Sequence, residues 1–159
     1  MIRTCRICHK DYSGEAFTGK GARLYGGRFN SSEKPAIYTS GSLSLSLLDM
    51  LVQTNDRSYF SSCVVLYAAI PRELISEHDS DSLPAGWDAV PYGSASQKFG
   101  DEWLVSQSSA VIKVPSVIVP AEHNYIINPS HRDFEKIRSS SPEKLPYDER
   151  LTMGPHAGK

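Results

Sequence analysis

The sequence predicts an α+β domain, and three observations lead to that prediction. Several short apolar runs, bounded by proline, glycine or asparagine, have the length and composition of β-strands. Two other segments begin at a serine and carry apolar side chains at helical spacing, as amphipathic helices do. Long stretches rich in glycine and serine connect these elements. Together these features are typical of an α+β domain.

The bulk properties of the chain favour one domain in a reducing compartment. Its 159 residues, of which 40% are hydrophobic, suffice for a sizeable core. The formal net charge of -1 argues against general nucleic-acid binding, which usually needs a cationic face. No apolar run has the length of a membrane span or a signal peptide, and three cysteines cannot all pair within one chain. We therefore expect a cytoplasmic protein without a membrane partner.

The first predicted element is a strand over residues 2–9, in which two isoleucines stand among polar residues. Residues 5–9 read CRICH, the C-x-x-C-H pattern by which c-type cytochromes attach haem. Haem attachment needs export and an axial ligand, and a zinc site needs further ligands nearby. The remaining cysteine and histidines are distant in sequence and show no paired spacing. We therefore predict no metal site, and we interpret the two thiols as incidental to the strand.

Residues 13–34 are predicted to form a glycine-rich loop that binds a small anion. Closely spaced glycines let a backbone turn tightly or approach a ligand, and arginine side chains beside them match phosphate or carboxylate. The order of the glycines fits neither a dinucleotide fingerprint, which needs a strand before it and a helix after it, nor a P-loop. The residues concerned are Gly19, Gly21, Gly26 and Gly27 with Lys20, Arg23, Arg28 and Lys34.

A short strand over residues 35–39 is entered from a proline, and Ser40 or Ser42 caps the helix that follows. Apolar side chains cover a wide arc of this helix. Its polar positions form a single stripe, which consists of Ser42, Ser46, Asp49 and Gln53. Two interpretations stay open: the stripe faces water, or the stripe, with Asp49 as its only charge, lines a cleft.

The remaining elements complete the sheet and add a second helix. Residues 62–70 are an apolar run typical of a central strand that is covered on both faces. Ser94 or Ser96 caps the second helix. Residues 110–120 predict two short strands broken at a Pro-Ser pair, and residues 123–128 predict one more strand.

The chain changes character near residue 138, where apolar anchors become few. We expect residues 1–137 to form the folded domain. Residues 138–159 are expected to form a polar C-terminal tail that is mobile or binds a partner.

Several segments resemble, in order, the motifs of RES-domain toxins from type II toxin–antitoxin pairs. The family motifs are G-A-x-x-x-G-G-R-W-N, V-V-Y-T-S, L-L-E-x-L-V, G-x-x-W-L, V-P-S and N-x-x-x-N-P-x-H-x-x-F. Each motif is weak by itself, and their shared order along residues 2–135 makes the resemblance specific. The matching segments are residues 21–30, 36–40, 47–52, 100–104, 114–120 and 124–134.

The resemblance implies a fold similar to that of ADP-ribosyltransferases, with a small mixed sheet and short helices. It also implies an enzyme that takes NAD+ as its substrate, without a prosthetic group, and cleaves the nicotinamide N-glycosidic bond by hydrolysis or phosphorolysis. Some relatives modify a protein instead. The usual partner is an antitoxin with an Xre-type helix-turn-helix domain, so DNA would be bound only through the antitoxin. The oligomeric state stays open, with a homodimer as one alternative.

Position by position, the resemblance places the family arginine on Arg28, its tyrosine on Tyr38 and its glutamate on Asp49. These roles imply that Arg28 clamps phosphate, that Tyr38 holds or stacks on nicotinamide, and that the acid stabilises positive charge on the ribose. Aspartate is one methylene shorter than glutamate, and a misplacement of about 1 Å can cost on the order of 100-fold in rate. An active enzyme and an attenuated module that mainly binds its antitoxin therefore both stay open.

The resemblance also implies a catalytic serine and three further NAD-binding residues. The serine falls on Ser116, with Ser106 and Ser109 as alternatives. The implied NAD-binding residues are Arg23, Ser40 and Asn124.

Overall fold

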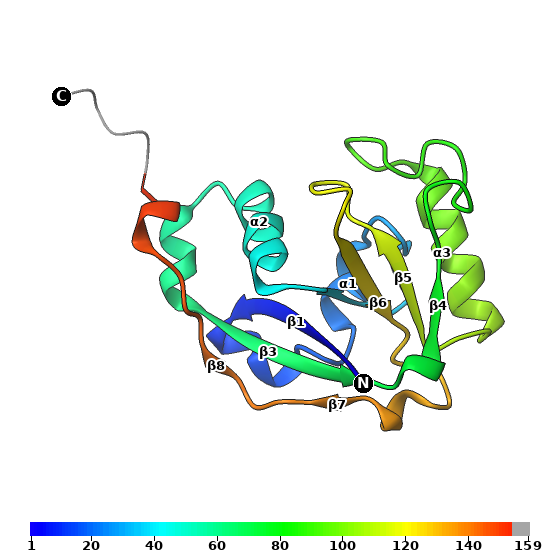
Figure 1. Cartoon of the computed structure of the whole chain (residues 1–159), viewed down its shortest axis with the longest axis horizontal. Helices are drawn as coiled ribbons and strands as arrows, with labels where there is room; N and C mark the ends of the chain where they lie inside the picture. The colour runs from blue at the N-terminus through cyan, green and yellow to red at the C-terminus, as the bar shows by residue number, and fades with distance from the viewer. Residues whose placement is uncertain (154–159) are drawn as a thin grey trace.

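The computed structural model describes residues 1–153, and it confirms the predicted α+β class (Figure 1). Its strands form one mixed sheet in the order β4-β5-β6-β2-β1-β3-β7, and β8 also pairs with β3. The strands are β1 Ile2–His9, β2 Ile37–Ser40, β3 Cys63–Ile70, β4 Ile75–Glu77, β5 Val111–Pro115, β6 His123–Ile127, β7 Arg138–Ser139 and β8 Glu143–Lys144. The α-helices are α1 Lys20–Tyr25, α2 Leu43–Gln53 and α3 Ser94–Ser106. Within residues 1–153, no helix has both the length and the apolar character that crossing a membrane requires.

The centre of the sheet is an antiparallel group around β2. This strand lies between β1 and β6, and among the strands of residues 1–153 only β4 and β5 pair in parallel. The register sets Ser40, the last residue of β2, opposite Cys5 on β1 and Asn124 on β6. Side chains from three strands are thereby brought together just before the chain enters α2.

The helices pack on different parts of this sheet. In Figure 1, α2 lies beside β1 and β2, whereas α3 runs beside β4 at the other edge. Leu43, Leu47 and Met50 of α2 pack on a core cluster that includes Ile7 and Val65. Trp103 and Leu104 of α3 pack with Phe29, Trp87, Ile112, Val114 and Ile126. Apolar side chains of α2 therefore pack on the core cluster of β1 and β3, and those of α3 pack on the core cluster of β5 and β6.

The predicted loop over residues 13–34 contains a short helix that the sequence analysis missed. Helix α1 starts after Gly19, whose φ is 76°, and ends at Gly26, whose φ is 73°. Left-handed backbone of this kind suits glycine best, and it stops a helix at both ends. Two of the glycines that we interpreted as signs of a continuous loop, Gly19 and Gly26, are therefore the boundaries of the six-residue helix α1.

The expected pair of strands over residues 110–120 is a single strand followed by a turn. Strand β5 ends at Pro115. The hydroxyl of Ser116 then accepts hydrogen bonds from the backbone N–H groups of Ile118 and Val119, at 3.1 Å each. A serine that bonds the backbone two and three residues ahead holds it in a turn, which explains why the second apolar run does not extend.

The C-terminal segment lies on the sheet as far as the structure describes it. Strands β7 and β8 both pair with β3, and Leu145 is 3% exposed in the core beside Phe60. The expectation of a polar tail from residue 138 followed from the scarcity of apolar residues, but one leucine and edge pairing are enough to hold this segment. Residues 154–159 of the expected tail lie outside the described residues.

Candidate active site

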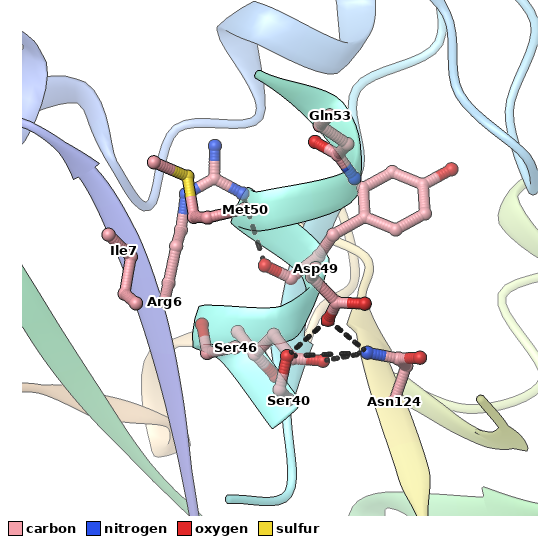
Figure 2. Close-up of a pocket in the computed structure, with 10 residues that line it drawn as sticks. Arg6, Ile7, Ser40, Ser46, Asp49, Met50, Gln53 and Asn124 are labelled. Carbon is pink, nitrogen blue, oxygen red and sulfur yellow. Dashed lines mark hydrogen bonds between the residues drawn. The ribbon is translucent and has the colours of Figure 1, made fainter. Parts of the chain in front are cut away.

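A cavity of about 150 Å³ opens where α2 faces the middle strands of the sheet (Figure 2). Strands β1, β2 and β6 and helix α2 each contribute side chains to it. The polar residues that line it are Arg6, Tyr38, Thr39, Ser40, Ser46, Asp49, Gln53 and Asn124. Four of the residues that the sequence analysis selected, Tyr38, Ser40, Asp49 and Asn124, thus meet in one cavity.

Helix α2 presents its polar stripe to this cavity. The helix begins at Ser42, whose hydroxyl accepts a hydrogen bond from the N–H of Leu45 at 3.1 Å. From that start, Ser46, Asp49 and Gln53 follow at helical spacing and line the cavity. Of the two interpretations of the stripe, the structure selects the cleft.

The Asp49 carboxylate is held through one of its two oxygens. Oδ2 accepts hydrogen bonds from the hydroxyl of Ser40 at 2.8 Å and from the amide of Asn124 at 3.1 Å. Among residues 1–153, no side chain donates a hydrogen bond to Oδ1. Burial raises the pKa of Asp49, and the two donors oppose that rise because they favour the charged form. The arrangement fixes one oxygen and leaves the other for a ligand.

Tyr38 lines the cavity while its hydroxyl points into the protein. The hydroxyl donates to Oδ1 of Asn30 at 2.6 Å and accepts from the N–H of Phe29 at 2.9 Å. Burial raises the pKa of the phenol well above its ordinary value, so Tyr38 stays neutral. What it offers a ligand is the ring.

Arg6 lies in the cavity, and the sequence analysis did not select it. Its guanidinium donates to the carbonyl of Tyr38 at 3.1 Å, and its buried Nε has no partner among the described residues. Burial lowers the pKa of Arg6, the expected effect on a cation removed from water. The signal in the sequence was that Arg6 is a cation within the predicted strand over residues 2–9. The haem-like spelling of the segment drew attention to the thiols instead.

Arg28 lies outside the cavity lining. Its guanidinium donates to the carbonyls of Trp87 at 3.0 Å and Ala89 at 2.7 Å. It also lies 5.8 Å from the ring centre of Tyr92. Burial lowers its pKa, and nearby Asp88 opposes that shift. Arg28 therefore extends from the loop after α1 to the loop before α3, where its guanidinium holds residues 87–89.

Arg23 and the candidate serines also lie away from the cavity lining. Arg23 forms an exposed ion pair with Glu33 at 3.8 Å. Ser116 is 1% exposed and holds the turn after β5. The alternative serines bond to Trp103: Ser109 accepts from its indole N–H at 2.9 Å, and Ser106 donates to its carbonyl at 2.9 Å.

The thiols of the haem-like segment belong to the strand. Cys5 is buried on β1, and burial raises its pKa to about 11, which makes the thiolate scarce at neutral pH. Within residues 1–153, no group of three or more His, Cys, Asp or Glu side chains is placed to hold a metal ion.

The cavity combines three kinds of group that suit charge stabilisation. A desolvated carboxylate with one free oxygen attracts developing positive charge and accepts a hydroxyl proton. The Tyr38 ring offers an aromatic face to a flat ring, and the Arg6 guanidinium offers charge to an anionic group. Such a site suits a ligand that carries an anion, a hydroxylated sugar and an aromatic ring.

Comparisons with known proteins identify the family to which the chain belongs. The chain is 37% identical over 131 residues to the protein named Toxin Res of Photorhabdus laumondii subsp. laumondii, covering 82% of this chain and 84% of the relative. It is 34% identical over 145 residues to the Prs ADP-ribosylating toxin of Sphingobium sp., covering 89% and 90%. A chain in the crystal structure of the M. tuberculosis MbcT–MbcA toxin–antitoxin complex shares the fold, with a TM-score of 0.67 at 16% identity, over 89% of this chain and 83% of that one. The RES domain family profile matches residues 3–148, so this chain belongs to the RES domain family.

Proposed function

We propose that this protein is the toxin of a toxin–antitoxin pair and that it cleaves the nicotinamide N-glycosidic bond of NAD+. The observation that carries the proposal is the carboxylate of Asp49, which lines the cavity and is held through Oδ2 by hydrogen bonds from Ser40 and Asn124. The name Toxin Res of one relative supports the role as a toxin. The name Prs ADP-ribosylating toxin of another supports a reaction on NAD+. We further propose that the reaction takes place in the cytoplasm.

The chemistry needs a placed negative charge more than a strong acid. Nicotinamide leaves as a neutral group, and the ribose develops positive charge at the anomeric carbon. The free oxygen of Asp49 accepts a hydrogen bond from a ribose hydroxyl and stabilises that charge. Because the carboxylate is already oriented by Ser40 and Asn124, it needs no reorganisation during the reaction.

Tyr38 and Arg6 bind the groups on either side of the nicotinamide ribose, which are the nicotinamide ring and a phosphate. The Tyr38 ring stacks on nicotinamide, because its hydroxyl is already bonded on both its donor and its acceptor side. Arg6, which lines the cavity, attracts a phosphate oxygen through the charge of its guanidinium. A volume of about 150 Å³ accommodates part of a dinucleotide, so the remainder lies along the surface outside.

The residues outside the lining retain proposed roles on that surface. Arg23 lies on α1 and Arg28 on the loop that follows it, on either side of Gly26 and Gly27. We propose that Arg28 binds the pyrophosphate after exchanging the carbonyls of Trp87 and Ala89 for phosphate oxygens. We propose that Ser116 acts indirectly, because it holds the turn that leads to β6 and so helps to position Asn124.

A second candidate function is the transfer of ADP-ribose to a protein. It is favoured by the name of the Sphingobium relative, an ADP-ribosylating toxin. The same carboxylate and ring serve both reactions, since the first bond broken is the same. Only the acceptor differs: water or phosphate in one case and a protein side chain in the other.

The antitoxin is proposed as the physiological partner, with an Xre-type helix-turn-helix domain that alone contacts DNA. The fold shared with a chain of a toxin–antitoxin complex supports this proposal. Neutralisation would follow if the antitoxin covers the cavity.

The experiment that tests the proposed function is incubation of purified protein with NAD+ and measurement of nicotinamide release. We expect wild type to release nicotinamide and Arg28→Ala to release it at least about 100-fold more slowly. Equal, slow release by both would reject the catalytic assignment and favour a module that mainly binds its antitoxin. Mass spectrometry of a protein from expressing cells, shifted by one ADP-ribose, would favour transfer over hydrolysis.

A further inference from the structure

The side chain of Asn30 is the most heavily bonded polar group near the candidate site. It is 0% exposed. Its amide nitrogen donates to the carbonyls of Ala22 at 2.8 Å, Lys34 at 2.9 Å and Ser31 at 3.2 Å. Its amide oxygen accepts from the hydroxyl of Tyr38 at 2.6 Å. One residue thus joins helix α1, the approach to β2 and the tyrosine of the cavity.

The backbone of Asn30 closes the turn that carries Arg28. Gly27 and Asn30 form a β-bridge, with hydrogen bonds of 2.9 Å and 3.4 Å between their backbone groups. Arg28 and Phe29 are the two residues enclosed by that bridge. The side chain of Gln97 on α3 donates to the carbonyls of both bridge residues, at 3.1 Å and 3.3 Å. This turn therefore sets the direction in which the side chain of Arg28 projects from the backbone.

The turn and the cavity share the hydroxyl of Tyr38. The hydroxyl accepts from the N–H of Phe29 and donates to Asn30, which uses its one hydrogen and one of its lone pairs. A Cβ built on Gly27 would lie 2.7 Å from the same oxygen, so the hydroxyl rests against the backbone of the turn. Any displacement of the turn therefore displaces the ring that lines the cavity.

We infer that Asn30 is a positioning residue for the proposed reaction, which sets Arg28 and the Tyr38 ring in one fixed relation to the Asp49 carboxylate. The inference rests on the proposed function. It differs from a purely structural role. In a purely structural role, loss of Asn30 would lower the amount of folded protein and leave the kinetics of the molecules that do fold unchanged. A misplacement of about 1 Å in such a site costs on the order of 100-fold in rate.

The matched comparison is Asn30→Asp against Asn128→Asp. Asn128 is 1% exposed, and its side chain also bonds backbone groups, donating to Leu104 at 3.2 Å and accepting from Ser130 at 3.0 Å. Both changes replace a buried amide by a carboxyl of the same shape, but only the first touches the turn. Both variants are measured with NAD+ at a temperature where each is folded by circular dichroism.

We expect Asn30→Asp to raise KM for NAD+ at least about 10-fold and to lower kcat/KM about 100-fold, with Asn128→Asp within about 3-fold of wild type in both. KM does not depend on the fraction of folded enzyme, so a purely structural role would leave it unmoved. An unchanged KM in Asn30→Asp, or the same rise in both variants, would overturn the inference.

A second measurement keeps the inference separate from the proposed function. Hydrogen exchange of the backbone amides of residues 26–33, without NAD+, should be at least about 10-fold faster in Asn30→Asp than in wild type or Asn128→Asp. If Asn30→Asp does not fold, Tyr38→Phe takes its place, with faster exchange expected at the Phe29 amide. Unchanged exchange in the variant that folds overturns the inference, even if wild type proves to release no nicotinamide.

Discussion

The amide nitrogen of Asn124 on β6 lies 3.1 Å from Oδ2 of Asp49 on α2, although 75 residues separate them in the sequence. Ser40 on β2 binds the same oxygen at 2.8 Å, and Asn124 also donates to the Ser40 hydroxyl at 3.3 Å (Figure 2). The three side chains form a closed triangle whose corners come from two paired strands and the helix beside them. The two hydrogen bonds compensate this half-buried carboxylate for lost hydration, and they leave one of its oxygens for chemistry.

The first prediction concerns the charge of Asp49. Asp49→Asn keeps an oxygen for both donors and removes only the charge, so we expect nicotinamide release to fall at least about 100-fold. Asp49→Glu keeps the charge and should retain at least about 10-fold more activity than Asp49→Asn. Asp81→Asn, an exposed site, is the control. Activity of Asp49→Asn close to wild type would show that the carboxylate is not used.

The same substitution should stabilise the protein. Burial raises the pKa of Asp49, so the folded state binds this proton more tightly than the unfolded state does. The stabilisation from the protonated form is complete below the unfolded-state pKa and is lost as pH rises through the folded-state pKa. At neutral pH we therefore expect a higher Tm for Asp49→Asn than for wild type, with the difference shrinking in acid. A lower Tm at neutral pH would contradict this.

The pH dependence of the reaction should move when Ser40 is changed. Activity that needs ionised Asp49 falls as pH drops through its pKa. Ser40 donates to the charged form and so holds that pKa down. Ser40→Ala should therefore shift the acid limb of the pH–rate profile to higher pH, whereas Ser44→Ala, an exposed site on the same helix, should not. A limb that stays in place in Ser40→Ala would mean that another group controls it.

Gly100 sets the close approach of α3 to the loop that carries Arg28. A Cβ at this position would lie 1.7 Å from the carbonyl oxygen of Phe29, which is backbone and cannot rotate away. Gly100→Ala should lower the free energy of unfolding by about 1–3 kcal/mol or more, measured by urea titration. Gly14→Ala, where no atom lies within 4 Å of the new Cβ, should stay within about 0.5 kcal/mol. Equal stability of the two variants would contradict this packing.

Arg28 should control the loop before α3 as well as the reaction. Residues 88–93 are exposed, and the guanidinium of Arg28 binds the carbonyl of Ala89 at 2.7 Å. Arg28→Ala should therefore increase the rate of proteolysis within residues 88–93 several-fold. Arg132→Ala, at a side chain that is 88% exposed, is the matched control. A loop equally resistant in all three proteins would show that Arg28 does not restrain it.

The C-terminal segment should contribute to stability through Leu145. This side chain is 3% exposed in the core cluster of β1 and β3. Leu145→Ala should cost about 2–5 kcal/mol of unfolding free energy, as large-to-small core substitutions do. Leu151→Ala, at a site 39% exposed, should cost less than about 1 kcal/mol. A small cost at both positions would mean that residues 138–151 are not part of the folded unit.

The strongest sequence patterns predicted the fold well because they are local. The apolar run over residues 62–70 became β3, and the serine at 42 does cap α2. Helix α1 was missed because its boundaries are glycines, which are typical of both loops and helix ends. The pairing of β7 and β8 with β3 was not predicted, because edge pairing depends on the position of a distant strand.

The site was predictable only in part, for a related reason. Helical spacing placed Ser46, Asp49 and Gln53 on one face, but only the sheet register brings Asn124 to that face. Arg6 was missed because nothing in its own strand predicts that its guanidinium meets the backbone carbonyl of Tyr38 on β2. Pattern and resemblance select residue types, and the contacts between distant strands decide which of them share a cavity.

The most direct test of the central claim is a crystal structure of Asp49→Asn with NAD+ bound. The account predicts that the nicotinamide ribose lies in the cavity beside residue 49, with a ribose hydroxyl within hydrogen-bond distance of that side chain and the nicotinamide ring against Tyr38. NAD+ bound at another surface, with the cavity between α2 and β6 still empty, would contradict it.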